Sequence, residues 1–336
     1  MDLVIIFAIP VIVGISYYLA KRAVLKSPGS QVSFENAILL IRVPKENEKD
    51  ALAAEQMFAS LHGLLKLTPG VQEHISFEIA ARADGIYFYA VCPRALRSFV
   101  ESQIYAQYPA AEIKESPDYA SYGEALHDKA VEGTELLLAK KQYFPIRTFT
   151  EFEVDPLAAI TSALSELHPD EQIWIQILVR PVPDVWQEEG YNYATSIKTG
   201  TSPVEIGMPA LVAAIKKELF LMPESFMKAL FHPGVSTMAR PDARRPGQVQ
   251  ITAGQELEVK AIELKLSKMG FETLVRVAII APTPEEALGR LRNVTASFRQ
   301  FSTANLNSFI PGEEITDRIS FLENYRLRSS PESGLY

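Results

Sequence analysis

The sequence contains very little cysteine and fewer basic than acidic residues. Its one cysteine, Cys92, excludes an internal disulfide framework and any metal site built from several thiolates. Lysine and arginine number 33 against 41 aspartate and glutamate residues, so the formal net charge is −8. Because phosphate contacts need a basic surface, direct nucleic-acid binding by the body of so acidic a chain is not expected. The 336 residues, of which 47% are hydrophobic, suffice for about two globular domains.

The motifs of the common catalytic and cofactor sites are also missing. No two glycines stand two positions apart, which excludes the GxGxxG dinucleotide fingerprint. Lys26 and Lys198 precede Ser or Thr but follow Leu25 and Ile197 instead of glycine, so no P-loop is present. The five histidines are scattered without zinc-site spacing, and we interpret His74, which opens a strand pattern, as structural. We therefore predict no catalytic residue, no cofactor and no metal site, and interpret Cys92 as a buried apolar residue.

Long uncharged runs are rare, and the one that stands out lies at the N-terminus. Residues 3–20 carry no charge and, as a helix of about 27 Å, would just cross a bilayer. Lys21, Arg22 and Lys26 follow at once, while Asp2 is the only charged side chain before the run. By the positive-inside rule, the sequence predicts a transmembrane anchor over residues 1–26 in contact with the lipid bilayer. The N-terminus would lie outside and the body on the cytoplasmic face of the inner membrane.

Two other interpretations of this run were weighed. A cleaved signal peptide would start with positive charges and end in a small-x-small site, whereas here the positive charges come last. A buried core helix is the second alternative, but the run stands at the extreme N-terminus with all its flanking positive charge on one side. The anchor is the interpretation that we carry forward.

The body alternates between strand and helix patterns. After a polar tether at residues 27–35, residues 36–116 show the order β-α-β-β-α-β, which is typical of a ferredoxin-like module. Residues 130–310 repeat this order with a helical insert at about 182–270, and residues 311–336 are expected to form a C-terminal helix and tail. Within the repeat, the pattern favours a strand over residues 135–143 and a helix over residues 252–269 with Thr252 as its N-cap. A further helix is expected to start at the capping box Thr283-Pro284-Glu285-Glu286. The predicted fold class is α+β: an N-terminal transmembrane helix followed by two ferredoxin-like modules, the second with the insert.

A loop inside the insert carries a small cluster of positive charge. Residues 232–250 contain three prolines and two glycines and show no periodic pattern, which favours a loop. Arg240, Arg244 and Arg245 lie within it, opposed by Asp242. The cluster is either a solvated linker or a contact for an anionic partner. In the second case its binding to DNA would weaken steeply with salt.

Several segments resemble a known family: Ala53–Leu64, Gln72–Ile79, Ile86–Ile113, Asp155–Leu164 and Phe298–Phe309. They are similar to the N-terminal, membrane-attached region of type IV secretion-like, conjugative-transfer ATPase proteins of candidate-phylum bacteria, a region that is itself a domain of unknown function. The resemblance covers most of residues 36–310. It implies membrane attachment and a place in a DNA- or protein-translocation machine. A P-loop motor follows this region in the longer proteins, but no such motif occurs up to Tyr336, so no catalytic residue is carried over.

These observations lead to one functional hypothesis and one alternative. The leading hypothesis is a membrane-anchored cytoplasmic scaffold or adaptor for a P-loop transfer ATPase or another subunit of a secretion machine. Open sheet edges would also allow homo-oligomers to form. The alternative is an enzyme of unknown class whose site lies between the two modules.

Overall fold

The computed structural model describes residues 35–44, 51–64, 73–121, 126, 128–153, 155–200, 251–303, 305–313 and 315–329. The chain divides into two compact units. The first combines Met1–Trp186 with Lys268–Tyr336, and the second is Gln187–Ser267. The predicted anchor with Lys21, Arg22 and Lys26 lies outside the described residues.

The described elements follow one another in the order strand, helix, strand, strand, helix, strand, and the second half of the chain repeats this order with further helices. They are β1 (Asn36–Arg42), α2 (Ala51–Leu61), η1 (His62–Leu64), β2 (Ile75–Arg82), β3 (Gly85–Pro93), η2 (Arg94–Leu96), α3 (Arg97–Gln107), β4 (Glu112–Glu115), β5 (Ala130–Leu138), η4 (Phe149–Glu151), α4 (Leu157–Ala163), β6 (Gln172–Pro181), η5 (Asp184–Trp186), α5 (Gln187–Thr199), α7 (Ala253–Leu266), β7 (Phe271–Ala281), α8 (Pro284–Ser297), η6 (Phe298–Phe301), β8 (Phe309–Pro311) and α9 (Arg318–Leu327).

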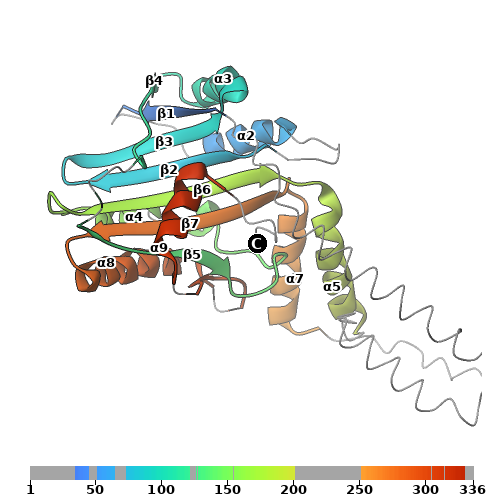
Figure 1. Ribbon diagram of the computed structural model, residues 1–336. Coiled ribbons are helices and arrows are strands. Elements are labelled where there is room, and N and C mark those ends of the chain that lie inside the picture. Colours follow the sequence, from blue (N-terminus) through green and yellow to red (C-terminus); the bar gives the residue numbers. More distant parts are fainter. Residues whose placement is uncertain are drawn as a thin grey trace, which may run out of the picture. The chain divides into compact units, whose positions relative to one another are not determined.

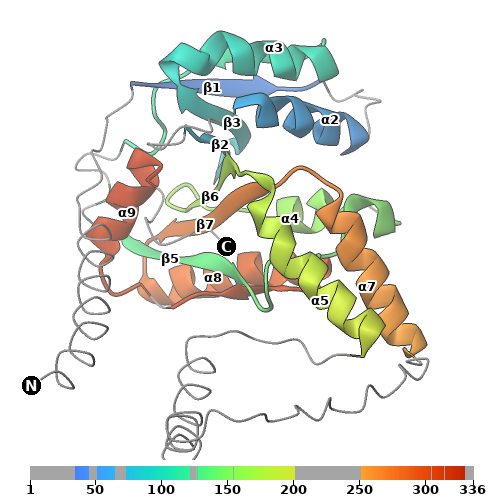
Figure 2. The ribbon, with the colours of Figure 1, turned by 90° about the vertical axis from the view of Figure 1, so that its right-hand side faces the viewer.

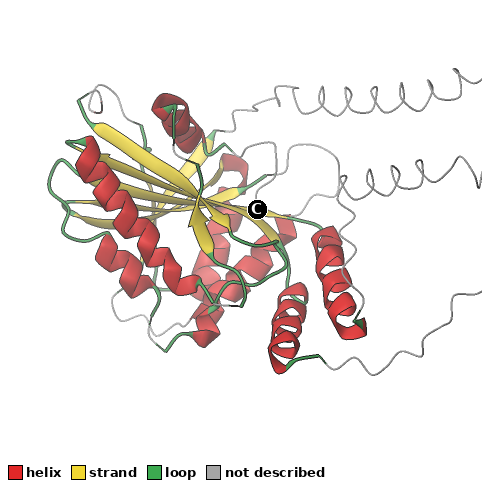
Figure 3. Cartoon of the chain, turned by 90° about the horizontal axis from the view of Figure 1, so that it is seen from below, coloured by secondary structure: helices red, strands yellow, loops and turns green. Residues whose placement is uncertain are grey.

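All eight described strands belong to a single sheet in the order β4-β1-β3-β2-β6-β7-β5-β8. Every neighbouring pair is antiparallel. The strands form one twisted layer with helices on both sides (Figure 1, Figure 3). The centre of the sheet is the β2–β6 pair, whose register runs from Ile75↔Val179 to Arg82↔Gln172.

The predicted fold class is wrong. Two separate ferredoxin-like modules were expected, but β2 and β6 pair over eight residues and join both halves into one sheet. The physical reason is that each half leaves one long strand edge with unpaired N–H and C=O groups, and pairing the two edges satisfies them. The described part of the chain also holds no helix with the length and hydropathy needed to cross a membrane.

The start of β5 differs from the sequence prediction. The pattern favoured a strand over residues 135–143, whereas β5 spans Ala130–Leu138. Residues 130–134 were not predicted as part of the strand, because Gly133 lies among them and glycine is depleted in strands. The residue fits there because the ring of Phe321 lies against it.

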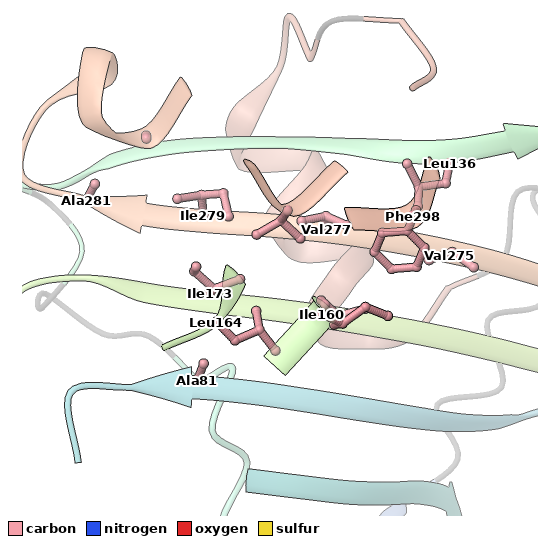
Figure 4. Packing of buried hydrophobic residues seen from close by; sticks show 13 residues of the cluster. Ala81, Leu136, Ile160, Leu164, Ile173, Val275, Val277, Ile279, Ala281 and Phe298 are labelled. Atoms are coloured by element: carbon pink, nitrogen blue, oxygen red, sulfur yellow. The ribbon is translucent and has the colours of Figure 1, made fainter. Parts of the chain in front are cut away.

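Helices cover the two faces of the sheet unequally. On one face, α2 and α3 pack over β1 and β3, while α4 and α8 pack over β6 and β7. Figure 4 shows the second of these cores, in which Leu164, the residue after α4, lies near Ile173 and Ile160 of α4 lies further along the strand. On the opposite face α9 lies across the strands, as Figures 1 and 2 show from two directions.

Local sequence signals explain why α8 begins at Pro284. Thr283 is its N-cap and accepts a hydrogen bond from the Glu286 backbone N–H, while the Glu286 carboxylate accepts one from the Thr283 N–H. This is the capping box that the sequence predicts, with Pro284 at the first helical position. The helix then presents Ala287 and Val294 to the sheet.

The second unit contains the helix pair α5 and α7. Tyr193 donates its hydroxyl to Glu258 at 2.7 Å, and Lys198 pairs with Glu263 at 2.5 Å, so polar contacts link the two helices. Thr252 caps α7 as predicted, but the helix ends at Leu266, earlier than the expected Met269. The Arg240, Arg244 and Arg245 cluster lies outside the described residues.

Candidate functional site

A row of polar side chains crosses the sheet face beneath α9. Glu78 on β2, Gln176 on β6, Arg276 on β7 and Glu135 on β5 are successive register partners on four adjacent strands. Because partners in register point to the same face of a sheet, the four side chains form one continuous line. We call this line the polar row.

Glu78 is the most buried carboxylate of the row, with a side chain that is 0% exposed. Its Oε1 accepts hydrogen bonds from Ser76 Oγ at 2.7 Å and Gln176 Nε2 at 2.9 Å. Its Oε2 accepts one from the Tyr119 hydroxyl at 2.7 Å. Arg328 donates to both oxygens, from Nε and Nη2, at 3.0 Å each. These five donors saturate the carboxylate, which therefore has no lone pair left to act as a general base.

Arg328 joins two carboxylates that come from distant parts of the chain. Besides Glu78, its guanidinium donates to both oxygens of Asp118, at 2.9 Å from Nη2 to Oδ1, and to the Arg326 carbonyl. Burial by itself would lower the pKa of Arg328, but the charges and hydrogen bonds of Glu78 and Asp118 outweigh burial and raise that pKa above its ordinary value. The guanidinium is therefore a permanent positive charge between two acids.

The rest of the row binds the C-terminal end of α9 through backbone carbonyls. Arg276 Nη1 donates to the carbonyls of Ser329 at 2.7 Å and Asn324 at 3.3 Å. Gln176 Nε2 donates to the Tyr325 carbonyl at 2.9 Å. The last carbonyls of a helix lack partners within the helix and carry partial negative charge, so an arginine and an amide N–H are suitable partners. Arg276 is itself paired with Glu135 at 2.9 Å.

Two tyrosines, Tyr119 and Tyr325 of α9, extend the hydrogen-bond network of Glu78. The Tyr119 and Tyr325 hydroxyls lie 3.0 Å apart, and Tyr119 stacks on Tyr89 with ring centroids 4.8 Å apart. Burial raises the pKa of both Tyr119 and Tyr325 well above the ordinary value, and the negative charge of Glu78 raises both further. Both phenols are therefore neutral near pH 7 and serve as hydrogen-bonding groups.

His74 lies beside the end of α9. Its ring hydrogen-bonds to the Arg328 backbone. Burial lowers the pKa of His74, the Arg328 hydrogen bond opposes that shift, and the charges of Arg180 and Arg276 add to it. The sequence interpretation of His74 as structural agrees with this position.

The arrangement is suited to holding a helix against the sheet. The carboxylates and guanidinium groups at its centre bond to one another, and Gln176 and Arg276 bond to carbonyls at the end of α9. Among the described residues, no group of three or more His, Cys, Asp or Glu side chains is placed to hold a metal ion. We therefore interpret the polar row as an attachment site for α9.

Outside the row, burial also shifts the pKa values of Cys92 and Lys265. Burial raises the pKa of the Cys92 thiol to about 11, which confirms the interpretation of this residue as a buried apolar side chain. Burial lowers the pKa of Lys265, in the second unit, to about 8. Lys265 was not singled out by sequence, because nothing in its local pattern shows that the side chain is buried.

The sequence analysis missed every residue of the polar row. One signal was available: Arg276 interrupts the apolar run of β7, and Glu78 interrupts that of β2, and a charge inside a buried strand needs a partner. The partners themselves could not be found, because Arg328 lies 250 residues from Glu78 in sequence. The charged residues that were singled out, at positions 21, 22, 26, 240, 244 and 245, lie outside the described residues.

Comparisons with known proteins give a family but no activity. No curated protein matches the chain. Among solved structures, the crystal structure of aclacinomycin oxidoreductase matches with a TM-score of 0.31 and 10% identity over 79% of this chain. The match covers 41% of that enzyme, and so weak a likeness carries no argument about fold or function. The family model of a domain of unknown function, DUF8128, matches residues 29–315, so the chain belongs to that family.

Proposed function

We propose that the protein is a non-catalytic scaffold or adaptor. The observation that carries this proposal is the polar row: its buried charges bond to one another and to the C-terminal helix, an arrangement suited to fixing a shape. Buried networks of this kind specify one arrangement of the chain and rigidify it when all members are satisfied. The purified chain is expected neither to bind nor to hydrolyse ATP, and magnesium-dependent turnover would contradict the proposal.

The proposed partner is a P-loop transfer ATPase or another subunit of a secretion machine. This part rests on the sequence resemblance to the N-terminal region of type IV secretion-like ATPase proteins. Crosslinking in native membranes, followed by mass-spectrometric identification of the trapped neighbour, tests it directly. Repeated capture of such an ATPase supports the partner assignment, and capture of unrelated proteins alone would discard it.

Self-association at the sheet edges is a separate proposal. The outer strands are β4, of four residues, and β8, of three residues. Glu112, Lys114 and Glu115 place charges along β4, and such short, charged edges limit uncontrolled pairing. An oligomer formed through β4 should therefore dissociate when Ile113 is replaced by proline, because proline cannot donate a backbone hydrogen bond. Light scattering would measure the change in mass.

The location at the inner membrane remains a proposal that rests on residues 3–20 and the basic residues that follow them. Fractionation of cells, with and without detergent, tests it, and protease added outside whole cells tests on which side the body lies. Recovery of the intact chain from the soluble fraction without detergent would contradict this placement. The enzyme alternative stays a prediction that no observation on the described residues favours.

A further inference from the structure

The connection between β6 and β7 is an insertion into a sheet that does not require it. From the centre of the sheet outward, the second half has the strand order β6-β7-β5-β8, which repeats the order β2-β3-β1-β4 of the first half. In the first half a tight turn joins β2 to β3, since Arg82 and Gly85 are register partners. In the second half residues 182–270 separate the last register partners, Pro181 and Phe271. Pairing of these two strands therefore does not depend on α5 and α7.

The two ends of the insertion meet on the first unit. The Val182 N–H donates to the Gly270 carbonyl at 3.1 Å, which continues the β6–β7 ladder by one bond. A Cβ atom on Gly270 would lie 2.1 Å from Nε1 of Trp186, so the indole ring lies directly on this glycine. The first unit is thus closed at Trp186, before α5 begins at Gln187. The helix pair is therefore suited to a purpose other than support of the sheet.

Helix α7 has apolar side chains on two opposite sides. Val259, Ile262 and Leu266 are buried on one side, and α7 packs with α5. Leu257 and Leu264 precede Val259 and Leu266 by two positions each, which corresponds to about 200° around a helix. The exposed fractions of these two leucines are 69% and 65%. An exposed apolar side on a helix that is already packed on its other side is suited to contact with a further helix.

Two of the acidic side chains of α7 are engaged by α5. The Tyr193 hydroxyl donates to the Glu258 carboxylate at 2.7 Å, and Lys198 is paired with Glu263 at 2.5 Å. The third acid, Glu256, stands in the first turn of α7, where the helix dipole favours a carboxylate. The negative charge of the helix is therefore committed to α5 and to the helix start.

A positive charge lies between the two exposed leucines. Lys260 is exposed and stands three residues after Leu257 and four residues before Leu264, which places it beside both. We call Leu257, Lys260 and Leu264 the outer face of α7. This face is apolar with a positive charge at its centre, so it is complementary to a helix that carries an apolar stripe and a carboxylate.

We propose that the outer face of α7 is the surface that binds the partner subunit, and that the bound element is a helix with an apolar stripe and a carboxylate opposite Lys260. The inference rests on the proposed adaptor function and adds the place of contact and the chemistry of the partner's element. Two leucines give a small contact area, so this contact by itself is weak and reversible. Lys260 contributes specificity, because it attracts an acidic helix and repels a basic one.

Photocrosslinking from single positions of the full-length chain in native membranes tests the place of contact. A photoreactive amino acid replaces Leu257 or Leu264, and the joined proteins are identified by mass spectrometry. We expect a P-loop transfer ATPase to be joined to both positions. The matched control carries the same amino acid at Ile319, which is 82% exposed on α9 in the first unit, and it should not be joined to the ATPase.

Charge reversal tests the predicted carboxylate. Lys260→Glu should lower the yield of the ATPase adduct from position 264 by about tenfold or more, because attraction becomes repulsion. Thermal unfolding should be unchanged, since the Lys260 side chain is exposed. Arg326→Glu, at an exposed position of α9, changes the net charge equally and should leave the yield unchanged. Equal yields from the Lys260 and Arg326 variants would overturn the proposed chemistry of the partner's helix.

The crosslinking results separate this inference from the adaptor function on which it rests. Capture of the ATPase at Ile319 but not from α7 would overturn the inference and leave the adaptor function standing. Absence of the ATPase from every position would overturn both. Adducts from α7 that join only this chain, within one molecule or between copies, would show that another part of the protein covers the outer face, and the inference would be discarded.

Discussion

Arg328 and Glu78 form a two-point ion pair that is almost completely buried. Their side chains are 3% and 0% exposed, and Nε–Oε1 and Nη2–Oε2 are each 3.0 Å apart. The pair joins the end of α9 to β2 and lies at the centre of the polar row. Removing one partner of a buried pair leaves an uncompensated charge, which is more damaging than removing both.

Replacement of Arg328 by methionine should therefore destabilise the protein strongly. The substitution leaves Glu78 and Asp118 without their common cation, and we expect the free energy of unfolding to fall by about 3–5 kcal/mol. Chemical denaturation measures this change. The double variant Glu78→Gln with Arg328→Met should recover part of the loss. Arg326→Met, on the exposed side, serves as the control and should change stability by less than about 1 kcal/mol.

Gly133→Ala should destabilise the protein through a steric clash. The new Cβ would lie 2.6 Å from the Phe321 ring and 2.7 Å from the Val277 carbonyl oxygen, and the backbone oxygen has little freedom to move. We expect a loss of about 1–3 kcal/mol in thermal or urea unfolding. Gly289→Ala, inside α8 with no neighbour within 4 Å, is the matched control and should be neutral or stabilising. Equal changes in stability for the two variants would contradict a steric clash at Gly133.

The stability of the protein should depend on pH through His74. Because burial lowers the pKa of His74 in the folded state, the unfolded chain takes up the proton first as pH falls. Stability should therefore be unaffected by this residue well above pH 6.5 and decrease below it. Urea unfolding between pH 5 and 8 measures the slope, and His74→Gln should reduce it. His168→Gln is the control, and an unchanged slope in the His74 variant would reject this explanation.

The Cys92 thiol should be unreactive in the folded protein. With a pKa of about 11, on the order of one thiol in a thousand is ionised at pH 8, and the side chain is buried in β3. A thiol reagent such as a nitrobenzoate disulfide should label it only slowly in buffer and at an ordinary rate in denaturing urea. Rapid labelling of the folded chain would show that β3 opens readily around this residue.

The sequence by itself determined the elements whose signals are local. The capping box at Thr283 and Glu286 marks the start of α8, and the apolar runs of β6 and β7 identify two long adjacent strands, because these signals depend on neighbours a few residues away. The burial of Cys92 followed from the same kind of local pattern.

Only the tertiary structure decided how these elements join. The pairing of β2 with β6 depends on two strand edges that satisfy each other's backbone groups, and many other edge pairings would fit the same sequence pattern. The meeting of Glu78 with Arg328 is likewise invisible in sequence, since each is an ordinary charged residue until the chain folds. A contact between residues 250 positions apart arises from packing of the whole sheet, and short-range periodicity carries no information about it.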